Sequence, residues 1–185
     1  MAVDTEAMGL NNQRDRLCVV QLSDGKGDVH LVQIDPNSFA APNLVKLLED
    51  PNRVKLFHFA RFDVAIILHY LGANASPVYC TKIASKLSRT YTDRHGLKDL
   101  CRELLGKDLS KQQQSSDWGA DALTEEQVTY AASDVLYLHA IREKLDVMLE
   151  REGRSEIAAA CFAFLPTRAV LDLAGWPDVD IFAHS

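Results

Sequence analysis

The side chains with the clearest chemical potential in this sequence are carboxylates, two of which stand close to its start. Asp4 and Glu6 are two residues apart, and such residues project from the same face of a β-strand. Because an unpaired charge is costly to bury, paired acids are uncommon inside a sheet and can mark a functional site. A frayed strand with both acids in solvent is the alternative that this motif alone leaves open.

Two further acids fall on predicted helices. Asp63 is in the first turn of a helix, where a negative charge also simply complements the helix dipole. Tyr130 and Asp134 are four residues apart, so a phenol and a carboxylate share one face of a long helix. Each of these motifs is weak by itself.

Together, the four acids predict a site for two divalent cations, Mg²⁺ or Mn²⁺, because these hard cations prefer oxygen ligands. The predicted metal ligands are Asp4, Glu6, Asp63 and Asp134. Two such ions, about 3.5–4 Å apart, would stabilise the attacking and leaving oxygens of a phosphoryl displacement. Tyr130 completes the catalytic set by orienting the attacking water, since a phenol with an ordinary pKa of about 10 is a poor base at neutral pH.

Asp4 and Glu6 require a strand to position them. Alternating or continuous apolar residues predict strands at residues 1–6, 16–23, 28–34 and 54–59. The turn at 24–27 joins the second and third of these strands into a hairpin. The fourth precedes a helix at 61–71, which we expect to end at Gly72.

Helices are predicted for most of the remaining chain. They cover residues 44–49, 80–89 and 97–105, with the last of them ending at Gly106. A capping box, Thr124-Glu-Glu-Gln127, begins the longest helix, which we expect to continue to about residue 152. The tail is expected to be partly helical, with a break at Pro166. Strands followed by helices predict an α/β fold, a mixed sheet flanked by helices.

Composition limits the class of protein. The chain has 185 residues, of which 47% are apolar and 25% charged, as expected for one soluble globular domain over 1–185. Residues 153–185 are expected to form a C-terminal tail. The net charge of −6 argues against a long surface that follows a phosphate backbone, and it favours short substrates bound in a local pocket.

Cysteine spacing and hydropathy bear on the cellular compartment. The four cysteines are widely spaced and form no CxxC, so we expect free thiols in a reducing cytoplasm. No apolar run reaches the roughly 18 residues that cross a bilayer, and the first residues do not resemble a signal peptide. The sequence therefore predicts a cytoplasmic protein with no membrane partner.

The order and spacing of the acids resemble the DEDDy 3′→5′ exonucleases. Asp4-Thr-Glu6, Phe62-Asp63 and Tyr130-Ala-Ala-Ser-Asp134 look like the three exonuclease motifs. The string Lys111-Gln-Gln-Gln-Ser-Ser-Asp-Trp118 is similar to ribonuclease D. The resemblance implies a ribonuclease H-like fold and a metal-dependent 3′→5′ exoribonuclease. One position departs from the pattern, because Phe59 stands where many of these exonucleases have Asn.

Further segments resemble the nano-RNase C group, the small relatives that cleave dinucleotides to mononucleotides. These are Cys80–Leu87, Arg89–Gly96 and the ending Asp180–Ser185. The resemblance implies short single-stranded RNA as substrate and a closed homo-oligomer, an octameric ring in that group. Two other functions stay open: a broader exonuclease on longer RNA or DNA ends, and an inactive ribonuclease H-like module that binds RNA.

Several residues are candidates for contacts with RNA: Thr5, Leu10, His58, Arg94, His95, Gln114 and Ser115. By resemblance to oligoribonucleases, Leu10 would wedge between two bases, although it could equally pack on its own protein. His58 could face the nucleotide or be a core histidine. Arg94 and His95 belong to a locally basic stretch suited to a 5′ phosphate, and Gln114 and Ser115 offer neutral donors. A solvated face and a plain polar loop are the respective alternatives.

The tail carries large apolar residues that a monomer would gain little by exposing. Trp176, Ile181 and Phe182 follow a proline and a glycine within a short segment. They predict that the tail contributes to a homo-oligomer interface. The alternative is that the tail folds back over its own core.

Overall fold

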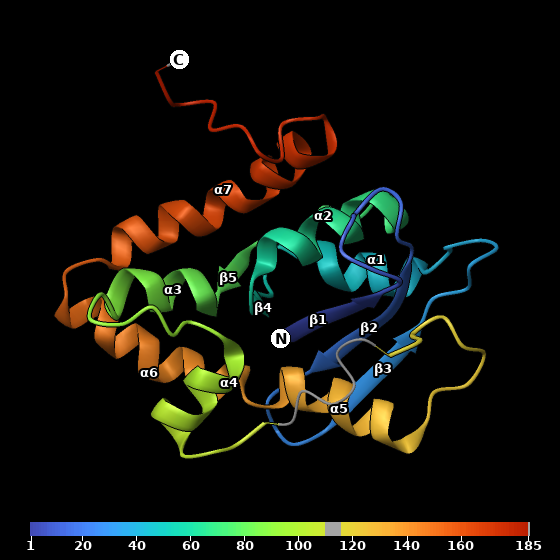
Figure 1. The fold of residues 1–185 in the computed structure, drawn as a ribbon, viewed down its shortest axis with the longest axis horizontal. Helices are drawn as coiled ribbons and strands as arrows, with labels where there is room; N and C mark the ends of the chain where they lie inside the picture. Colours follow the sequence, from blue (N-terminus) through green and yellow to red (C-terminus); the bar gives the residue numbers. More distant parts are fainter. Residues whose placement is uncertain (110–115, 185) are drawn as a thin grey trace.

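The computed structural model describes residues 1–109 and 116–184, and its centre is a five-stranded mixed sheet (Figure 1). The strands are β1 (Ala2–Ala7), β2 (Leu17–Ser23), β3 (Val29–Gln33), β4 (Lys55–Phe57) and β5 (Val78–Cys80). They are arranged in the order β3-β2-β1-β4-β5. β1, β2 and β3 pair antiparallel, whereas β1 with β4 and β4 with β5 pair parallel.

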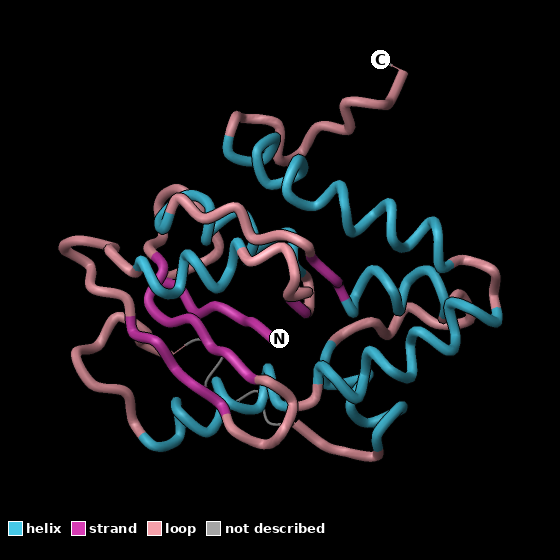
Figure 2. The backbone as a smooth tube through the Cα atoms, turned by 180° about the vertical axis from the view of Figure 1, so that it is seen from behind, coloured by secondary structure: helices cyan, strands magenta, loops and turns pink. Residues whose placement is uncertain are grey.

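Helices account for most of the remaining described chain, as the tube in Figure 2 shows. They are α1 (Pro42–Glu49), α2 (Ala60–Leu71), α3 (Thr81–Ser88), α4 (Leu97–Leu100), the π-helical turn η1 (Cys101–Leu105), α5 (Glu125–Leu136), α6 (Leu138–Arg151) and α7 (Ser155–Leu173). The predicted α/β fold, a mixed sheet flanked by helices, is thereby confirmed. Among the described helices, none is long and apolar enough to cross a membrane.

Alternation along β1 separates two helices onto opposite faces of the sheet. Asp4 and Glu6 lie near Asp134 of α5, while Thr5 between them bonds to Asp63 of α2. Successive strand residues point to opposite faces, so α5 and α2 cover different sides of β1. β1 therefore lies between two helices and presents polar side chains to both.

Local signals in the sequence ended or began helices where they were expected to. Gly72 adopts the left-handed conformation with φ 65° after α2, and Gly106 does the same after η1. The capping box at α5 is formed, because Thr124 Oγ1 accepts from the Gln127 amide and the Gln127 side chain accepts from the Thr124 amide. Such bonds satisfy helix donors that have no partner within the helix.

The long helix predicted from Thr124 to about residue 152 is wrong in one respect, because it is divided. α5 ends at Leu136 and α6 begins at Leu138, with Tyr137 between them at φ −102° and ψ −3°. α5 contacts β1, β2 and β3, whereas α6 contacts α3. The two apolar faces pack against different partners, and no Gly or Pro marks the division.

Three more predicted boundaries need correction. α7 continues through Pro166 instead of breaking there. Phe162 and Leu165, which precede Pro166 in the helix, are buried. The helix at 97–105 changes to π-helical geometry at Cys101. The segment expected to be helical from residue 80 is preceded by β5, a three-residue strand too short to show a pattern. Tertiary packing overrides weak local preference at such places.

The core is formed by the sheet and the helices on its two faces. β2 is buried along its whole length, as expected for a strand covered on both sides. α7 packs against α2, and the segment that follows it extends away from the body of the molecule (Figure 1). The four cysteines are free thiols, as predicted.

Candidate active site

Three carboxylates meet at the face of β1 that α5 covers. Oxygen atoms of Asp4, Glu6 and Asp134 all lie within 4.8 Å of one another. Asp4 and Glu6 share this face because they are two residues apart on the strand, and Asp134 approaches from the last turns of α5. The amide of Gln21 on β2 donates to Glu6 Oε1 at 3.3 Å and so orients that carboxylate.

The fourth acid reaches the same place from the opposite side of the sheet. Asp63 is buried in the first turn of α2, and its Oδ1 accepts a hydrogen bond of 2.6 Å from Thr5 Oγ1. Thr5 follows Asp4 in the strand and faces the other way. Its hydroxyl therefore fixes Asp63 relative to the strand that carries two of the other acids.

Burial and mutual repulsion disfavour the ionised form of these acids when no cation is bound. Burial, then the negative charge of Asp134, raises the pKa of Glu6 to about 9. Burial also raises the pKa of Asp63 and of Asp134 to about 7 each, and that of Asp4 well above its usual range. Four converging carboxylates with this tendency fit divalent cations, because a cation would offset the repulsion and carboxylate oxygens suit Mg²⁺ and Mn²⁺.

Tyr130 lies one helical turn before Asp134 on α5. Burial, then the charge of Asp134, raises the pKa of the phenol above its ordinary value. Tyr130 is therefore protonated at neutral pH and can act as a hydrogen-bonding group, not as a base. Its ring centroid is 6.0 Å from that of the buried Trp118, which restricts its position.

All five predicted catalytic residues line one cavity of about 680 Å³. Its other lining residues come from the turn after β1, the segment that follows β4, the starts of α2, α3 and α4, and the segment before α5. A cavity of this size is in the range of about 300–1,000 Å³ found for small-ligand sites. The acids lie in a pocket that suits a short substrate.

The comparison with known proteins agrees with this geometry. A family model described as 3′-5′ exonuclease matches residues 1–150. The chain belongs to the 3′-5′ exonuclease family. The predicted resemblance to the DEDDy exonucleases, and through them the ribonuclease H-like fold, is confirmed.

Individual members of the 3′-5′ exonuclease family are similar over most of the chain. Ribonuclease D of Gluconacetobacter diazotrophicus is 36% identical over 166 residues, which are 89% of this chain and 42% of that protein. The chain thus spans about two fifths of the length of the curated relatives it matches. NrnC of Brucella melitensis with bound Mg²⁺ is 58% identical with a TM-score of 0.95, covering 100% of this chain and 90% of that one.

NrnC of Brucella melitensis has also been solved bound to pGG. That structure is 59% identical with a TM-score of 0.96, and the match covers 100% of this chain and 89% of that chain. This similarity agrees with the nano-RNase C resemblance expected from the sequence.

Three of the predicted RNA contacts also line the cavity. Thr5 is nearly buried between the acids, and Leu10 is 90% exposed in the turn after β1. A Cβ at Gly9 would lie 2.3 Å from Asp15 Oδ2, so a side chain there would displace the carboxylate that accepts from the Asn11 amide in the turn that presents Leu10. His58 Nδ1 and Thr81 Oγ1 are 2.9 Å apart, and burial lowers the pKa of His58 to about 3, so this histidine is neutral.

Of the other four predicted contacts, the structure describes two, Arg94 and His95. Arg94 is exposed in the loop between α3 and α4, and His95 Nδ1 lies 2.8 Å from Ser85 Oγ. Neither lines the cavity, so their roles stay predictions. Gln114 and Ser115 lie outside the described residues.

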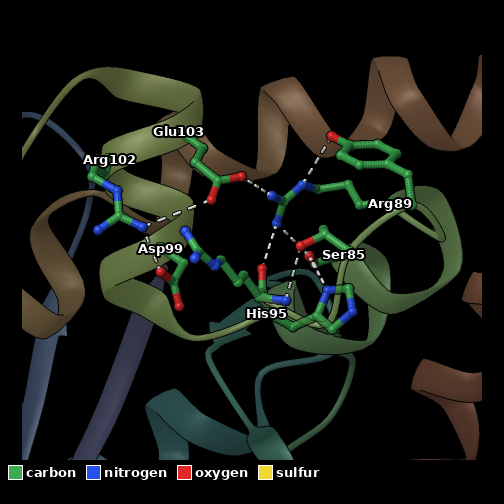
Figure 3. Close-up of polar contacts among 9 residues, drawn as sticks. Ser85, Arg89, His95, Asp99, Arg102 and Glu103 are labelled. Atoms are coloured by element: carbon green, nitrogen blue, oxygen red, sulfur yellow. Dashed lines mark hydrogen bonds and ion pairs between the residues drawn. The ribbon is translucent and has the colours of Figure 1, made fainter.

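Arg89, five residues before Arg94, is not available to bind phosphate. Arg89 is completely buried, and Figure 3 shows its guanidinium enclosed by polar groups. It donates to Ser85 Oγ at 3.1 Å and to the Arg94 carbonyl at 2.9 Å, and it pairs with Glu103 of η1. Arg89, at the end of α3, therefore links this helix to η1. It also holds the loop before α4, whose first residues line the cavity. The alternative of a solvated face therefore does not hold at Arg89.

Sequence reasoning missed or undervalued several cavity residues, among them Met8, Phe59, Phe62, Gly96, Leu97 and Leu109. Most of these are apolar or backbone surfaces without a distinctive chemical signature. Phe59 did carry a signal, because it departs from the family pattern. Lys82 and Lys98 supply the positive charge among the described lining residues.

Proposed function

We propose that this chain is a metal-dependent 3′→5′ exoribonuclease that degrades very short RNA, dinucleotides included, to 5′-mononucleotides by two-metal-ion hydrolysis. One observation carries the proposal: four carboxylates and a phenol, from β1, α2 and α5, converge in one small cavity. The complete set of acids favours an enzyme over an inactive RNA-binding module, since loss of one ligand would disable such a site.

Asp4, Glu6, Asp63 and Asp134 would hold the two cations. When bound, Mg²⁺ or Mn²⁺ supplies Lewis-acid stabilisation of the negative charge that develops on the phosphate oxygens. Thr5 keeps Asp63 in place through its hydroxyl. Tyr130, protonated at neutral pH, would hold the attacking water in line with the scissile phosphate. NrnC of Brucella melitensis binds Mg²⁺, which supports the same chemistry for this chain.

Charge and cavity size support a preference for the shortest RNA. Each added nucleotide brings another phosphate, and a chain of net charge −6 offers little positive surface to bind it. Lys82 and Lys98 are the cations among the described lining residues. NrnC of Brucella melitensis has been solved with pGG, a ligand of matching length. A broader exonuclease for longer RNA or DNA ends is the competing function.

The decisive experiment compares RNA length at fixed salt. Single-turnover cleavage of 5′-labelled RNAs of two to ten nucleotides is measured with Mg²⁺ and with Mn²⁺, beside DNA of the same lengths. We expect kcat/KM to be highest for the 5′-phosphorylated dinucleotide. Equal or faster cleavage of a seven-nucleotide RNA would instead assign a general exonuclease.

The assembly and compartment are part of this proposal. Trp176, Ile181 and Phe182 are exposed in the extended tail, which supports a homo-oligomer, with an octameric ring as the expected form. The four free cysteines suit a reducing compartment, and we place the enzyme in the cytoplasm, with no membrane partner.

A further inference from the structure

Phe59 has an unusual backbone and an unusual exposure for a phenylalanine. It precedes α2 with φ 66° and ψ 43°, a left-handed conformation that bulky side chains rarely adopt. It is also 47% exposed, and it lines the cavity that holds the acids. Phe39, which also has positive φ, stacks on Tyr70 with ring centroids 5.0 Å apart. Packing between aromatic rings accounts for Phe39 but not for Phe59.

The ring of Phe59 is covered on one face by a cation. Lys82 Nζ is 4.4 Å from the ring centroid, within the range of a cation–π contact. Lys82 lines the same cavity and takes part in none of the ion pairs that the described residues form. Its charge therefore lies in the cavity that holds the acids, without a carboxylate partner among the described residues.

The placement of both residues follows from the parallel pairing of β4 and β5. Phe57 is paired with Cys80 at the ends of these strands. Beyond that pair, Thr81 Oγ1 donates to the Phe57 carbonyl at 3.1 Å and contacts His58 Nδ1 at 2.9 Å. Phe59 follows His58, and Lys82 follows Thr81. The carboxyl ends of parallel strands, where ligands commonly bind, thus present an aromatic ring and a cation together.

We infer that Phe59 and Lys82 form a nucleotide-binding wall of this cavity. A nucleobase stacks on the ring face that Lys82 leaves uncovered, and the Lys82 ammonium contacts a phosphate of the same short RNA. Stacking on an aromatic ring is tolerant of base identity, which suits an enzyme that must accept every sequence. The inference rests on the proposed function for its ligand class. It explains why Phe59 is exposed and has a strained backbone.

Binding of product mononucleotide tests the wall separately from cleavage. Adenosine 5′-monophosphate and ribose 5-phosphate are titrated calorimetrically in Mg²⁺ against the whole chain. In the Phe59→Asn variant we expect affinity for adenosine 5′-monophosphate to fall about tenfold, with ribose 5-phosphate unaffected. Asn adopts the left-handed conformation more readily than Phe, so the thermal midpoint should be preserved. Phe59→Tyr should retain binding.

The Lys82→Met variant tests the phosphate contact. We expect weaker binding of both ligands, and a shallower dependence of log kcat/KM for a short RNA on log salt, by about 0.7. Lys46→Met, a change of the same type on an exposed position of α1, should leave the salt dependence as it is. An unchanged slope in Lys82→Met would overturn the phosphate contact.

The remaining outcomes are also decisive. Equal affinity of Phe59→Asn and the original chain for adenosine 5′-monophosphate, or an equal loss for both ligands, would overturn the stacking role. If Phe59→Asn does not fold, Phe59→Leu tests the stacking role instead. An aliphatic side chain should weaken nucleotide binding, whereas Phe59→Tyr should retain it. Mononucleotide binding without any RNA cleavage would reject the proposed function and leave the wall intact. Absence of both would reject both.

Discussion

The hydroxyl of Thr5 donates a 2.6 Å hydrogen bond to the buried carboxylate of Asp63, linking the central strand to the helix on its far face. The strand thereby controls all four acids: it carries Asp4 and Glu6, faces Asp134, and holds Asp63 through this bond. A residue that is not itself an acid thus sets the geometry of the proposed metal site.

Loss of the Thr5 hydroxyl should therefore weaken metal binding. We expect Thr5→Val to lower the affinity for Mn²⁺ by about 10- to 100-fold, as found when partners of metal ligands are removed. Thr5→Ser keeps the hydroxyl and should stay close to the original affinity. Calorimetric titration of Mn²⁺ measures both variants. An unchanged affinity in Thr5→Val would show that Asp63 needs no such support.

The acids themselves should be indispensable. We expect Glu6→Gln and Asp134→Asn to abolish cleavage of short RNA while circular dichroism shows an intact fold, because each removes a proposed metal ligand. EDTA should inhibit the original chain reversibly. Glu143→Gln, at an exposed site on α6, is the matched control and should remain active. Activity of Glu6→Gln or Asp134→Asn within about tenfold of the original would reject the metal assignment.

Tyr130 should affect the chemical step more than binding. Its protonated hydroxyl would orient water, and a positioned group of this kind typically contributes about 10²–10⁴-fold to the rate. We expect Tyr130→Phe to lower kcat by an amount in this range with KM nearly unchanged. Steady-state kinetics on a dinucleotide separates the two constants. A kcat equal to that of the original chain would reduce Tyr130 to a packing role.

The metal-free protein should lose stability as the pH rises. Folding raises the pKa of Glu6 to about 9 and that of Asp134 to about 7, so the folded state binds these protons more tightly than the unfolded chain does. Stability is then greatest below the ordinary carboxyl pKa and decreases as the pH passes through about 7 and about 9. Divalent cations bind the ionised form and should reverse this trend.

Thermal denaturation at about pH 6 and about pH 9, with EDTA and with Mg²⁺, tests that dependence. We expect the midpoint in EDTA to be lower at the higher pH, and the Mg²⁺-induced rise to be larger there. Glu6→Gln should flatten the pH dependence in EDTA. A metal-free midpoint that increases with pH would contradict the proposed burial of repelling charges.

The tail should contribute to assembly. Trp176 is 47% exposed and Phe182 is 78% exposed, beyond a helix that packs well on α2. Such apolar groups are typical of an interface, so we expect light scattering to report a species several times larger than 20.6 kDa. Trp176→Ser with Phe182→Ser should reduce that mass. A monomer for the original chain would show that the tail has another role.

The sequence by itself determined the parts of this protein that depend on local pattern. The spacing of Asp4 and Glu6, and of Tyr130 and Asp134, already placed each pair on one face of its element. Gly72 and the Thr124 capping box located helix ends, because these signals act within a few residues. The family followed from the same motifs.

Only the tertiary structure decided the distant contacts that no sequence motif marks. Tyr137 divides the long helix because two apolar faces pack on different elements, and no local residue records that. Its sequence context predicts that Arg89 is a surface cation. Arg89 is buried instead, and it pairs with Glu103, fourteen residues away. Phe59 and Lys82 come together because β4 and β5 pair in register. Contacts of this kind depend on long-range packing and strand register, which the local sequence pattern does not encode.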